Sequence, residues 1–299
     1  MLEFRDITLE DKQRVESCTK SVNYHLCEHC FTDLFIWRGH YETKICFYKE
    51  FLLVKMKTTD DKKTMYLAPV GNGDLADAIK MLEQDAKDNN IEFAMCSIAE
   101  DMKPQIEALF PDRYEYNTDE SGWDYIYLSE KLQTLSGKKL QSKRNLVNRF
   151  LANYEGRWSY EDISPINTHD AFNFHIKWCE QNGCMRDNSF WGETCAIGAG
   201  LNHFEALNLK GGILRLDGEV IAFTFGSQAT DDMFVVQIEK ADSNIAGAYQ
   251  MINQQFVKKN CTHVKYVNRE EDLGLEGLRK AKKSYYPEMM GVKYCARIK

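Results

Sequence analysis

The chain has 299 residues, of which 43% are hydrophobic and 12% aromatic, enough for two domains of about 150 residues that each have a core. Its formal net charge of −7 argues against nonspecific binding of nucleic acid by the whole surface. No apolar run reaches the roughly 18 residues of a transmembrane helix, and the charged start from Met1 to Asp6 does not fit a signal peptide. We therefore expect a cytoplasmic protein without a membrane span, whose 10 scattered cysteines are reduced thiols.

The first half is expected to alternate strands with helices. Thr8 is a plausible N-cap for the first helix, and the segment from Gly71 to Asp74 leads into a helix with Leu75, Ile79 and Leu82 on one face. The expected strands are 3–5, 44–48, 51–57, 65–69 and 92–98, and the expected helices begin near residues 9, 75 and 101.

The second half repeats this order. The turn Asp217-Gly218 predicts a hairpin between its neighbouring strands. A shift of about 171 residues places Gly71–Asn89 on Asp242–Asn260 and matches the halves element for element. The expected strands are 157–163, 212–216, 220–226, 233–239 and 263–267, and the expected helices are 169–179, 246–259 and 275–285. We predict an N-terminal domain over 1–125, a connecting strand and basic helix over 126–155, and a C-terminal domain over 156–299.

Five basic residues fall within twelve positions, although the chain as a whole is acidic. This group indicates either a solvated helix face or a surface that contacts the phosphates of a nucleotide cofactor or an RNA. Its members are Lys138, Lys139, Lys143, Arg144 and Arg149.

A glycine-containing loop joins the apolar strand that ends in Glu239 to the next helix. Backbone N–H groups at a helix start can bind a pyrophosphate, and Gly247 would let the phosphate approach closely. An ordinary loop that needs one flexible residue is the alternative. The candidate cofactor-binding residues here are Ile238, Asn244, Ile245, Ala246, Gly247 and Ala248.

After this helix a strand ends in Asn268, and Ala281, Tyr285, Tyr286 and Gly291 follow. The order of these elements and residues resembles that of GNAT acyltransferases. The resemblance implies that the loop holds the pyrophosphate of coenzyme A, and that Asn268 and the tyrosines lie beside its pantetheine arm and thioester. The loop departs from the family pattern Q/R-x-x-G-x-G/A, with an asparagine at its first position and Tyr249 at its last.

A narrower resemblance covers nearly the whole chain. The segments that carry it are Cys30-Phe31, Leu34–Trp37, Pro69–Gly71, Asp124–Tyr127, Leu132, Gly137-Lys138, Lys143–Asn145, Phe150, Asn268–Gly274 and Gly277–Lys282. With these segments the sequence is similar to the soluble C-terminal domain of phosphatidylglycerol lysyltransferases, which implies aminoacyl transfer from a charged tRNA. The membrane-spanning half of those enzymes is not in this sequence, so a lipid acceptor is not expected.

Both resemblances imply an α/β (α+β) fold of two tandem GNAT-like domains, each a mixed central sheet flanked by helices. Acyl transfer needs a base and an acid. Glu239 is the candidate base, with Glu270 and Asp272 as competitors, and Tyr285 is the candidate acid, with Tyr286 as its alternative. A surface carboxylate and a core aromatic are the structural alternatives for Glu239 and Tyr285.

Charges of both signs surround the turn after Asn268. Arg279 and Lys282, together with Arg269, suit either a clamp for phosphate or a terminal adenosine, or a salt-bridge network with the nearby acids. Near the N-terminus, the cluster His25, Cys27, His29 and Cys30 has one zinc-like Cys-x-x-Cys pair, but no second pair follows, so no metal site is predicted.

Three functions remain open from the sequence. The first is an acyltransferase that uses a coenzyme A thioester and an amine or hydroxyl acceptor. The second is an aminoacyltransferase that uses aminoacyl-tRNA, and the third is a non-catalytic ligand-binding protein. The first half lacks the asparagine and tyrosine features, so we expect it to shape the acceptor side.

Overall fold

The computed structural model describes residues 2–59, 61–182 and 188–299, and the chain divides into two compact units. The N-terminal unit comprises Met1–Asp124, Glu271–Gly274 and Met290–Lys299, and the C-terminal unit comprises Tyr125–Glu270 and Leu275–Met289. These units differ from the contiguous domains expected from the sequence, because the last strand pairs in the N-terminal sheet.

The N-terminal unit is built on a mixed sheet with the strand order β1-β2-β3-β4-β6-β15-β7, and β5 pairs with β3. Strands β4 and β6 are parallel, whereas β15 is antiparallel to both of its neighbours. The strands are β1 (Arg5–Asp6), β2 (Lys44–Tyr48), β3 (Phe51–Lys57), β4 (Thr64–Leu67), β5 (Val70–Gly71), β6 (Ala94–Ala99), β7 (Tyr114–Asn117) and β15 (Lys293–Ile298). The helices are α1 (Lys12–Lys20), α2 (Phe31–Ile36), α3 (Leu75–Asp88) and α4 (Lys103–Leu109).

Local sequence signals account for the helix α3. The Asp74 side chain caps it by accepting a hydrogen bond from the Asp77 N–H. Ile79 and Leu82 lie on its apolar face and are fully buried in the core of the unit. The sequence therefore predicted this helix and its buried face.

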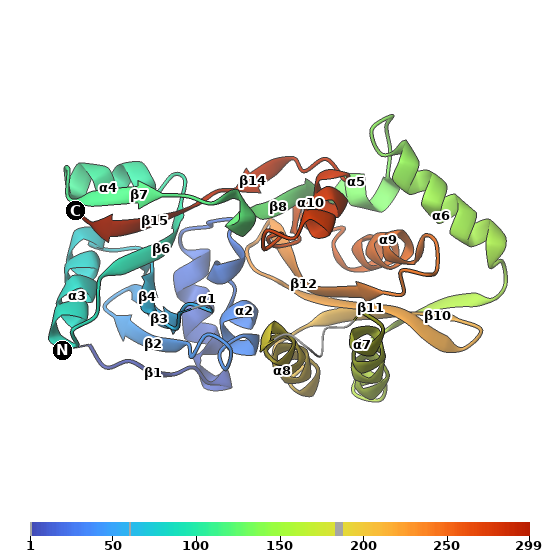
Figure 1. Ribbon diagram of the computed structural model, residues 1–299, viewed down its shortest axis with the longest axis horizontal. Coiled ribbons are helices and arrows are strands. Elements are labelled where there is room, and N and C mark those ends of the chain that lie inside the picture. The colour runs from blue at the N-terminus through green and yellow to red at the C-terminus, as the bar shows by residue number, and fades with distance from the viewer. Residues whose placement is uncertain (1, 60, 183–187) are drawn as a thin grey trace. The chain divides into compact units, whose positions relative to one another are not determined.

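The C-terminal unit has a second mixed sheet with the order β14-β8-β13-β12-β11-β10-β9, in which β12 and β13 are parallel. Figure 1 shows α9 on one side of strands β10 to β12 and α7 and α8 on the other. The strands are β8 (Asp124–Leu128), β9 (Trp158–Asp162), β10 (Lys210–Leu216), β11 (Glu219–Gln228), β12 (Met233–Ala241), β13 (Tyr266–Asn268) and β14 (Met289–Gly291). The helices are α5 (Ser129–Thr134), α6 (Gln141–Asn153), α7 (Thr168–Asn182), α8 (Asn188–Asn202), α9 (Ala248–Asn260) and α10 (Glu276–Lys283).

Each of the two sheets contains the same type of connection, in which a helix joins two parallel strands. Helix α3 leads from β4 to the parallel strand β6, and α9 leads from β12 to the parallel strand β13. The hairpin between β10 and β11 turns at Asp217 and Gly218, whose φ angles of +52° and +88° suit a tight two-residue turn. The expected duplication and the tandem arrangement of mixed sheets flanked by helices are confirmed.

The expectation that all cysteines are reduced thiols was wrong. Cys96 of β6 and Cys295 of β15 form a disulfide, 199 residues apart in the chain, whereas all cysteines were expected to be reduced. The two residues meet because β15 returns to the N-terminal sheet, a pairing that no local pattern indicates. Among the residues described, none of the helices combines the length and the apolar character that crossing a membrane requires.

Candidate functional site

A largely buried ion pair joins the ends of two neighbouring strands in the C-terminal sheet. Glu239 lies near the end of β12, and Arg269 directly follows β13. The Arg269 Nη2 atom is 2.7 Å from Glu239 Oε1, and Asn253 Nδ2 of α9 donates to Glu239 Oε2 at 2.8 Å. Both carboxylate oxygens therefore accept a hydrogen bond. This arrangement fits a carboxylate that holds Arg269 in place, and it fits less well the free base that the sequence analysis expected.

Two buried tyrosines lie beside the Arg269 guanidinium. Its central carbon is 4.9 Å from the ring centroid of Tyr285 and 5.7 Å from that of Tyr127. Burial raises the pKa of Tyr285 to about 12 although Arg269 acts in the opposite sense. Tyr285 is therefore a neutral phenol at neutral pH, able to donate a hydrogen bond.

One nitrogen of the Arg269 guanidinium donates no hydrogen bond within the part of the chain that the structure describes. Arg269 Nη1 is buried and has no hydrogen-bond partner among the residues that the structure describes. Asn253 is 1% exposed, and its Oδ1 atom also has no partner within the described ranges. Buried donors and acceptors are nearly always satisfied in folded proteins, so each of these two atoms is a position where a ligand group or an ordered water molecule is expected.

The basic segment predicted from the sequence divides into two parts. Lys143 of α6 places Nζ 4.6 Å from the Tyr285 ring centroid, and Lys139 places Nζ 5.3 Å from that of Tyr286. Burial lowers the pKa of Lys143, and the nearby Arg269 adds to this effect. Arg144 has a structural role instead, because its Nη1 donates to the carbonyls of Leu135 and Gly137 at 2.5 and 3.3 Å.

Lys138 and Arg149, the other two members of the segment, are exposed. Tyr286 is 53% exposed, unlike the buried Tyr285. The structure thus brings Lys139 and Lys143 to the same tyrosine pair that the sequence proposed for the chemistry.

The expected phosphate loop has a different reason for its glycine. Gly247 has a φ of +92° and begins α9, and a Cβ added there would lie 2.6 Å from the Leu146 carbonyl oxygen of α6. The glycine is therefore required for close packing of the loop against α6. The interpretation that it makes room for a phosphate at this point is not supported by the packing.

The amides of the loop are largely used within it. Asn244 N–H donates to the Asp242 side chain, Ile245 N–H to the Asp242 carbonyl, and Ala248 N–H to the Ile245 carbonyl. Ala248 is buried, Ile245 half-buried and Ala246 exposed, whereas Ile238 lies in the buried part of β12. The loop as folded offers fewer free donors than a pyrophosphate site would use.

The residues after β13 divide between the two units. Asn268 is buried, and its Oδ1 accepts from the Glu270 N–H at 2.7 Å. Lys282 of α10 is buried, and its Nζ donates to the Arg269 carbonyl at 2.6 Å. Arg279 is half-buried on the same helix.

Asp272 belongs to the N-terminal unit, where its Oδ1 accepts from the Gly274 N–H at 2.8 Å. This carboxylate shapes a local turn, and it is not in the unit that contains Glu239. The sequence placed the two acids in competition for one role because it could not show that the chain changes unit between Glu270 and Glu271.

The N-terminal unit holds a second buried cluster of charges. Lys293 Nζ lies 2.8 Å from both Glu28 Oε1 and Asp124 Oδ1, and 3.8 Å from Glu271 Oε2. Burial alone would lower the pKa of Lys293, but the carboxylates, Asp124 first, raise it well above its usual value. Lys293 therefore remains charged inside the unit.

The N-terminal cysteine and histidine cluster does not form one site. Cys27 Sγ lies 3.5 Å from Lys293 Nζ, and burial raises the pKa of its thiol. His29 is 2% exposed, and burial lowers its pKa to about 4. The group of ligand-type atoms that includes Cys27 draws its other members from Asp124 and Glu271, and not from the neighbouring histidines.

The sequence patterns did not indicate two residues of the candidate site, Tyr127 and Asn253. The sequence pattern around Tyr127 predicts only a buried strand residue, because its contact with Arg269 depends on the pairing of β8 with β13. Asn253 carried a usable signal, because it is an amide between the buried Ile252 and Phe256 of an apolar helix face. A polar side chain at such a position usually has a partner to satisfy.

Comparison with known proteins adds a family and relatives. Residues 19–297 match the model of the family described as "Phosphatidylglycerol lysyltransferase, C-terminal". A crystal structure of a protein of unknown function from Bacteroides thetaiotaomicron is 39% identical and covers all of both chains with a TM-score of 0.96. The structure of L-PGS from Bacillus licheniformis is 16% identical, with a TM-score of 0.60 over 88% of this chain and 85% of that one.

An uncharacterised protein of Mycoplasmoides gallisepticum is 25% identical over 179 residues, which are 60% of this chain and 57% of that protein. The chain therefore spans little more than half the length of this relative. The likeness to L-PGS concerns the fold alone.

Proposed function

The chain belongs to the family of phosphatidylglycerol lysyltransferase C-terminal domains, and we propose that it transfers an aminoacyl group from a charged tRNA to an amine or hydroxyl acceptor. The family takes its description from a lysyltransferase. The proposal goes further by naming the donor, and it rests on the chemistry of the site around Arg269.

The observation that carries the proposal is the unfilled Arg269 Nη1 donor. When a nucleophile adds to an ester carbonyl, negative charge develops on the carbonyl oxygen, and a buried donor held in advance lowers the barrier. Arg269 is held by Glu239 at 2.7 Å and by the tyrosine rings, so its free N–H has a fixed direction. We assign it the role of binding this oxygen.

The surface beside the buried pair suits the terminal adenosine of the donor. Tyr286 is exposed, and Lys139 lies over its ring. An exposed aromatic ring is a platform on which a base stacks, and a lysine next to it can contact a phosphate. Coenzyme A also carries an adenosine and phosphates, but the internal hydrogen bonds of the Asp242–Ala248 loop favour tRNA over it.

The remaining roles follow from the protonation states. The acceptor amine or hydroxyl attacks the acyl carbon, the bond from this carbon to the tRNA 3′-oxygen breaks, and the proton that the acceptor loses balances the proton that this oxygen takes up. Tyr285 is a neutral phenol beside Arg269, so it can donate a hydrogen bond to the departing oxygen. Glu239 and Asn253 act through Arg269 as positioning residues.

The experiment compares two variants, Lys143→Met and Arg149→Met, each of which replaces one basic residue of α6 by methionine. Lys143 of α6 lies against Tyr285, whereas Arg149 of the same helix is exposed. We expect Lys143→Met to weaken binding of aminoacyl-tRNA about tenfold and to reduce its salt dependence, and Arg149→Met to change neither much. Binding is measured by filter retention of labelled aminoacyl-tRNA, and transfer by the label that moves to an amine or hydroxyl acceptor.

A calorimetric titration with coenzyme A runs in parallel. Binding of tRNA without binding of coenzyme A supports the proposal. Micromolar binding of coenzyme A that Lys143→Met abolishes, with no binding of tRNA, would replace the donor with an acyl thioester. Equal effects of the two variants on tRNA would remove Lys143 and the tyrosine pair from the donor site.

A further inference from the structure

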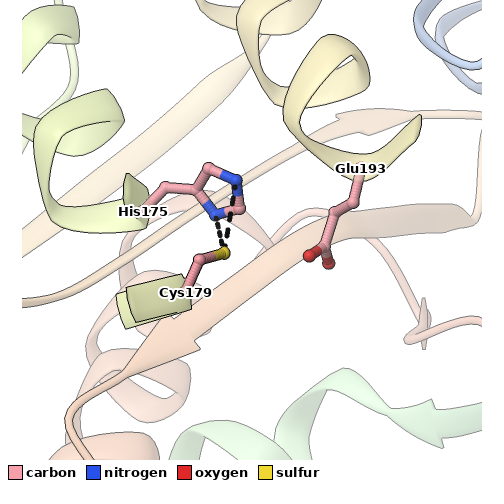
Figure 2. A group of neighbouring side chains, drawn as sticks. All are labelled: His175, Cys179 and Glu193. Carbon is pink, nitrogen blue, oxygen red and sulfur yellow. Dashed lines mark hydrogen bonds between the residues drawn. The ribbon is translucent and has the colours of Figure 1, made fainter. Parts of the chain in front are cut away.

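A histidine, a cysteine and a glutamate meet on the face of the C-terminal sheet that α7 and α8 cover. His175 and Cys179 lie one turn apart on α7, and Glu193 comes from α8. Figure 2 shows the three side chains converging, with Cys179 Sγ 3.6 and 3.7 Å from the two nitrogens of His175. One ligand atom from each residue lies within 4.8 Å of the other two.

These distances suit a metal ion with soft and borderline ligands. Two ligand atoms on one tetrahedral zinc lie roughly 3.3–3.8 Å apart, because zinc–nitrogen and zinc–sulfur bonds are about 2.0–2.1 and 2.3 Å long. The sulfur–nitrogen separation already has this value, and the carboxylate needs to move by up to about 1.5 Å. Thiolate and imidazole favour zinc over magnesium or calcium, which take oxygen ligands.

The surroundings supply the other parts of such a site. His175 Nε2 is 3.0 Å from Thr194 Oγ1, a contact that fixes the ring as an outer partner of a metal-bound histidine does. His175 and Cys179 are both fully buried. We propose that His175, Cys179 and Glu193 bind one Zn²⁺ ion that ties α7 to α8, with the fourth tetrahedral position left to a water molecule.

A competing cation sits at the third ligand. Lys240 Nζ lies 2.7 Å from Glu193 Oε1 and 2.9 Å from Oε2, and it packs 3.9 Å from the Trp178 ring centroid. Lys240 neighbours Glu239 on β12, and successive strand residues point to opposite faces. The zinc site therefore lies across the sheet from Arg269, and it does not depend on the proposed transfer reaction. Zinc must displace Lys240 from the carboxylate, so Lys240 lowers the affinity for the metal.

The test uses cobalt as a coloured probe for zinc. Protein stripped of metal with a chelator is titrated with Co²⁺, and we expect one equivalent to give a thiolate-to-cobalt charge-transfer band that Zn²⁺ removes. Cys179→Ser is expected to abolish this band, and Cys195→Ser, which changes an exposed cysteine of α8, to leave it unchanged. Thr194→Val is expected to weaken zinc affinity roughly 10- to 100-fold.

Lys240→Met is expected to change the zinc affinity in the opposite direction, because methionine keeps the packing on Trp178 but removes the charge that competes with zinc for Glu193. We expect zinc to bind this variant several-fold more tightly than the parent protein, which also keeps the test decisive if Cys179→Ser does not fold. The proposal is overturned if Co²⁺ in excess gives no sulfur band or if the band survives Cys179→Ser. It is also overturned if the band disappears in Cys195→Ser or in Cys27→Ser, or if Lys240→Met weakens binding.

Discussion

Each unit of the chain contains a largely buried cation next to carboxylates, Lys293 in one unit and Arg269 in the other, and the two cations are satisfied to different degrees. Lys293 in the N-terminal unit has Glu28 and Asp124 at 2.8 Å and Glu271 at 3.8 Å. Arg269 in the C-terminal unit has one carboxylate, two aromatic rings and a buried nitrogen without a partner in the described ranges. The fold depends on a cation that is surrounded by acids, because its removal leaves buried charges without a partner, whereas a cation with an unpaired donor is prepared for a ligand.

The largest effect is expected from the saturated cluster. Lys293→Met leaves three carboxylates without their cation, and removing one partner of a buried ion pair typically costs about 3–5 kcal/mol. We expect a loss of this size in the free energy of unfolding, measured with urea, and unchanged tRNA binding per folded molecule. Lys44→Met, at an exposed pair with Asp6, is the control and should cost less than about 1 kcal/mol. A comparable loss in both variants would contradict the distinction.

The unfilled cation should show the reverse pattern. Arg269→Met removes the donor assigned to the developing oxyanion, and loss of one such donor typically lowers kcat about 10²–10³-fold. Arg269→Lys retains the charge but not the fork of donors, so it should recover little. The ratio kcat/KM for transfer from aminoacyl-tRNA measures the effect. The comparison fails if Lys293→Met lowers this ratio as strongly in its folded fraction.

A third prediction concerns the pH dependence of the N-terminal unit. Burial lowers the pKa of His29 to about 4 from its ordinary value of 6.5, so the unfolded chain binds the proton more readily. Stability is complete above pH 6.5 and is lost as the pH falls toward 4, by about 2 kcal/mol between neutral pH and pH 5. Glu28, Asp101 and Lys293 are the charged groups that act on this histidine.

The measurement is urea unfolding at several pH values for the parent protein and for His29→Gln. We expect the variant to lose the part of the pH dependence that lies between pH 6.5 and 5. An identical slope in both proteins would show that His29 does not titrate in this window.

Local signals made much of the fold predictable. The hairpin at Asp217-Gly218, the strands β2 and β3 and the apolar face of α3 are set by residues that are neighbours in the chain. Strand β15 could not be predicted as part of the N-terminal sheet, because its partners β6 and β7 are separated from it by the whole C-terminal unit. The Cys96–Cys295 disulfide was missed for the same reason.

The candidate site shows a similar division. The sequence named Glu239, Tyr285 and Lys143, and the structure brings all three to Arg269 or its neighbouring ring. The sequence could not show that Glu239 forms an ion pair with Arg269, since this pairing depends on the register of β12 and β13. The sequence also identified Gly247 as a position of close approach, but it could not show that the approaching group is the Leu146 carbonyl.

The smallest effect is expected at the exposed ring beside the cluster. Tyr286 has a φ of +54° and lies under Lys139, so Tyr286→Phe keeps the aromatic face and Tyr286→Leu keeps only the bulk. Stacking of one base on an aromatic ring contributes about 1–3 kcal/mol, and the exposure of Tyr286 places it toward the lower end. We expect Tyr286→Leu to weaken tRNA binding roughly tenfold, or about 1.4 kcal/mol, and Tyr286→Phe to bind like the parent protein. Both variants have the same backbone strain at a non-glycine residue with positive φ, so a difference between them reports on the aromatic face. Equal affinities of the two variants for tRNA would mean that Arg269 and Lys143 bind the donor without a stacked base.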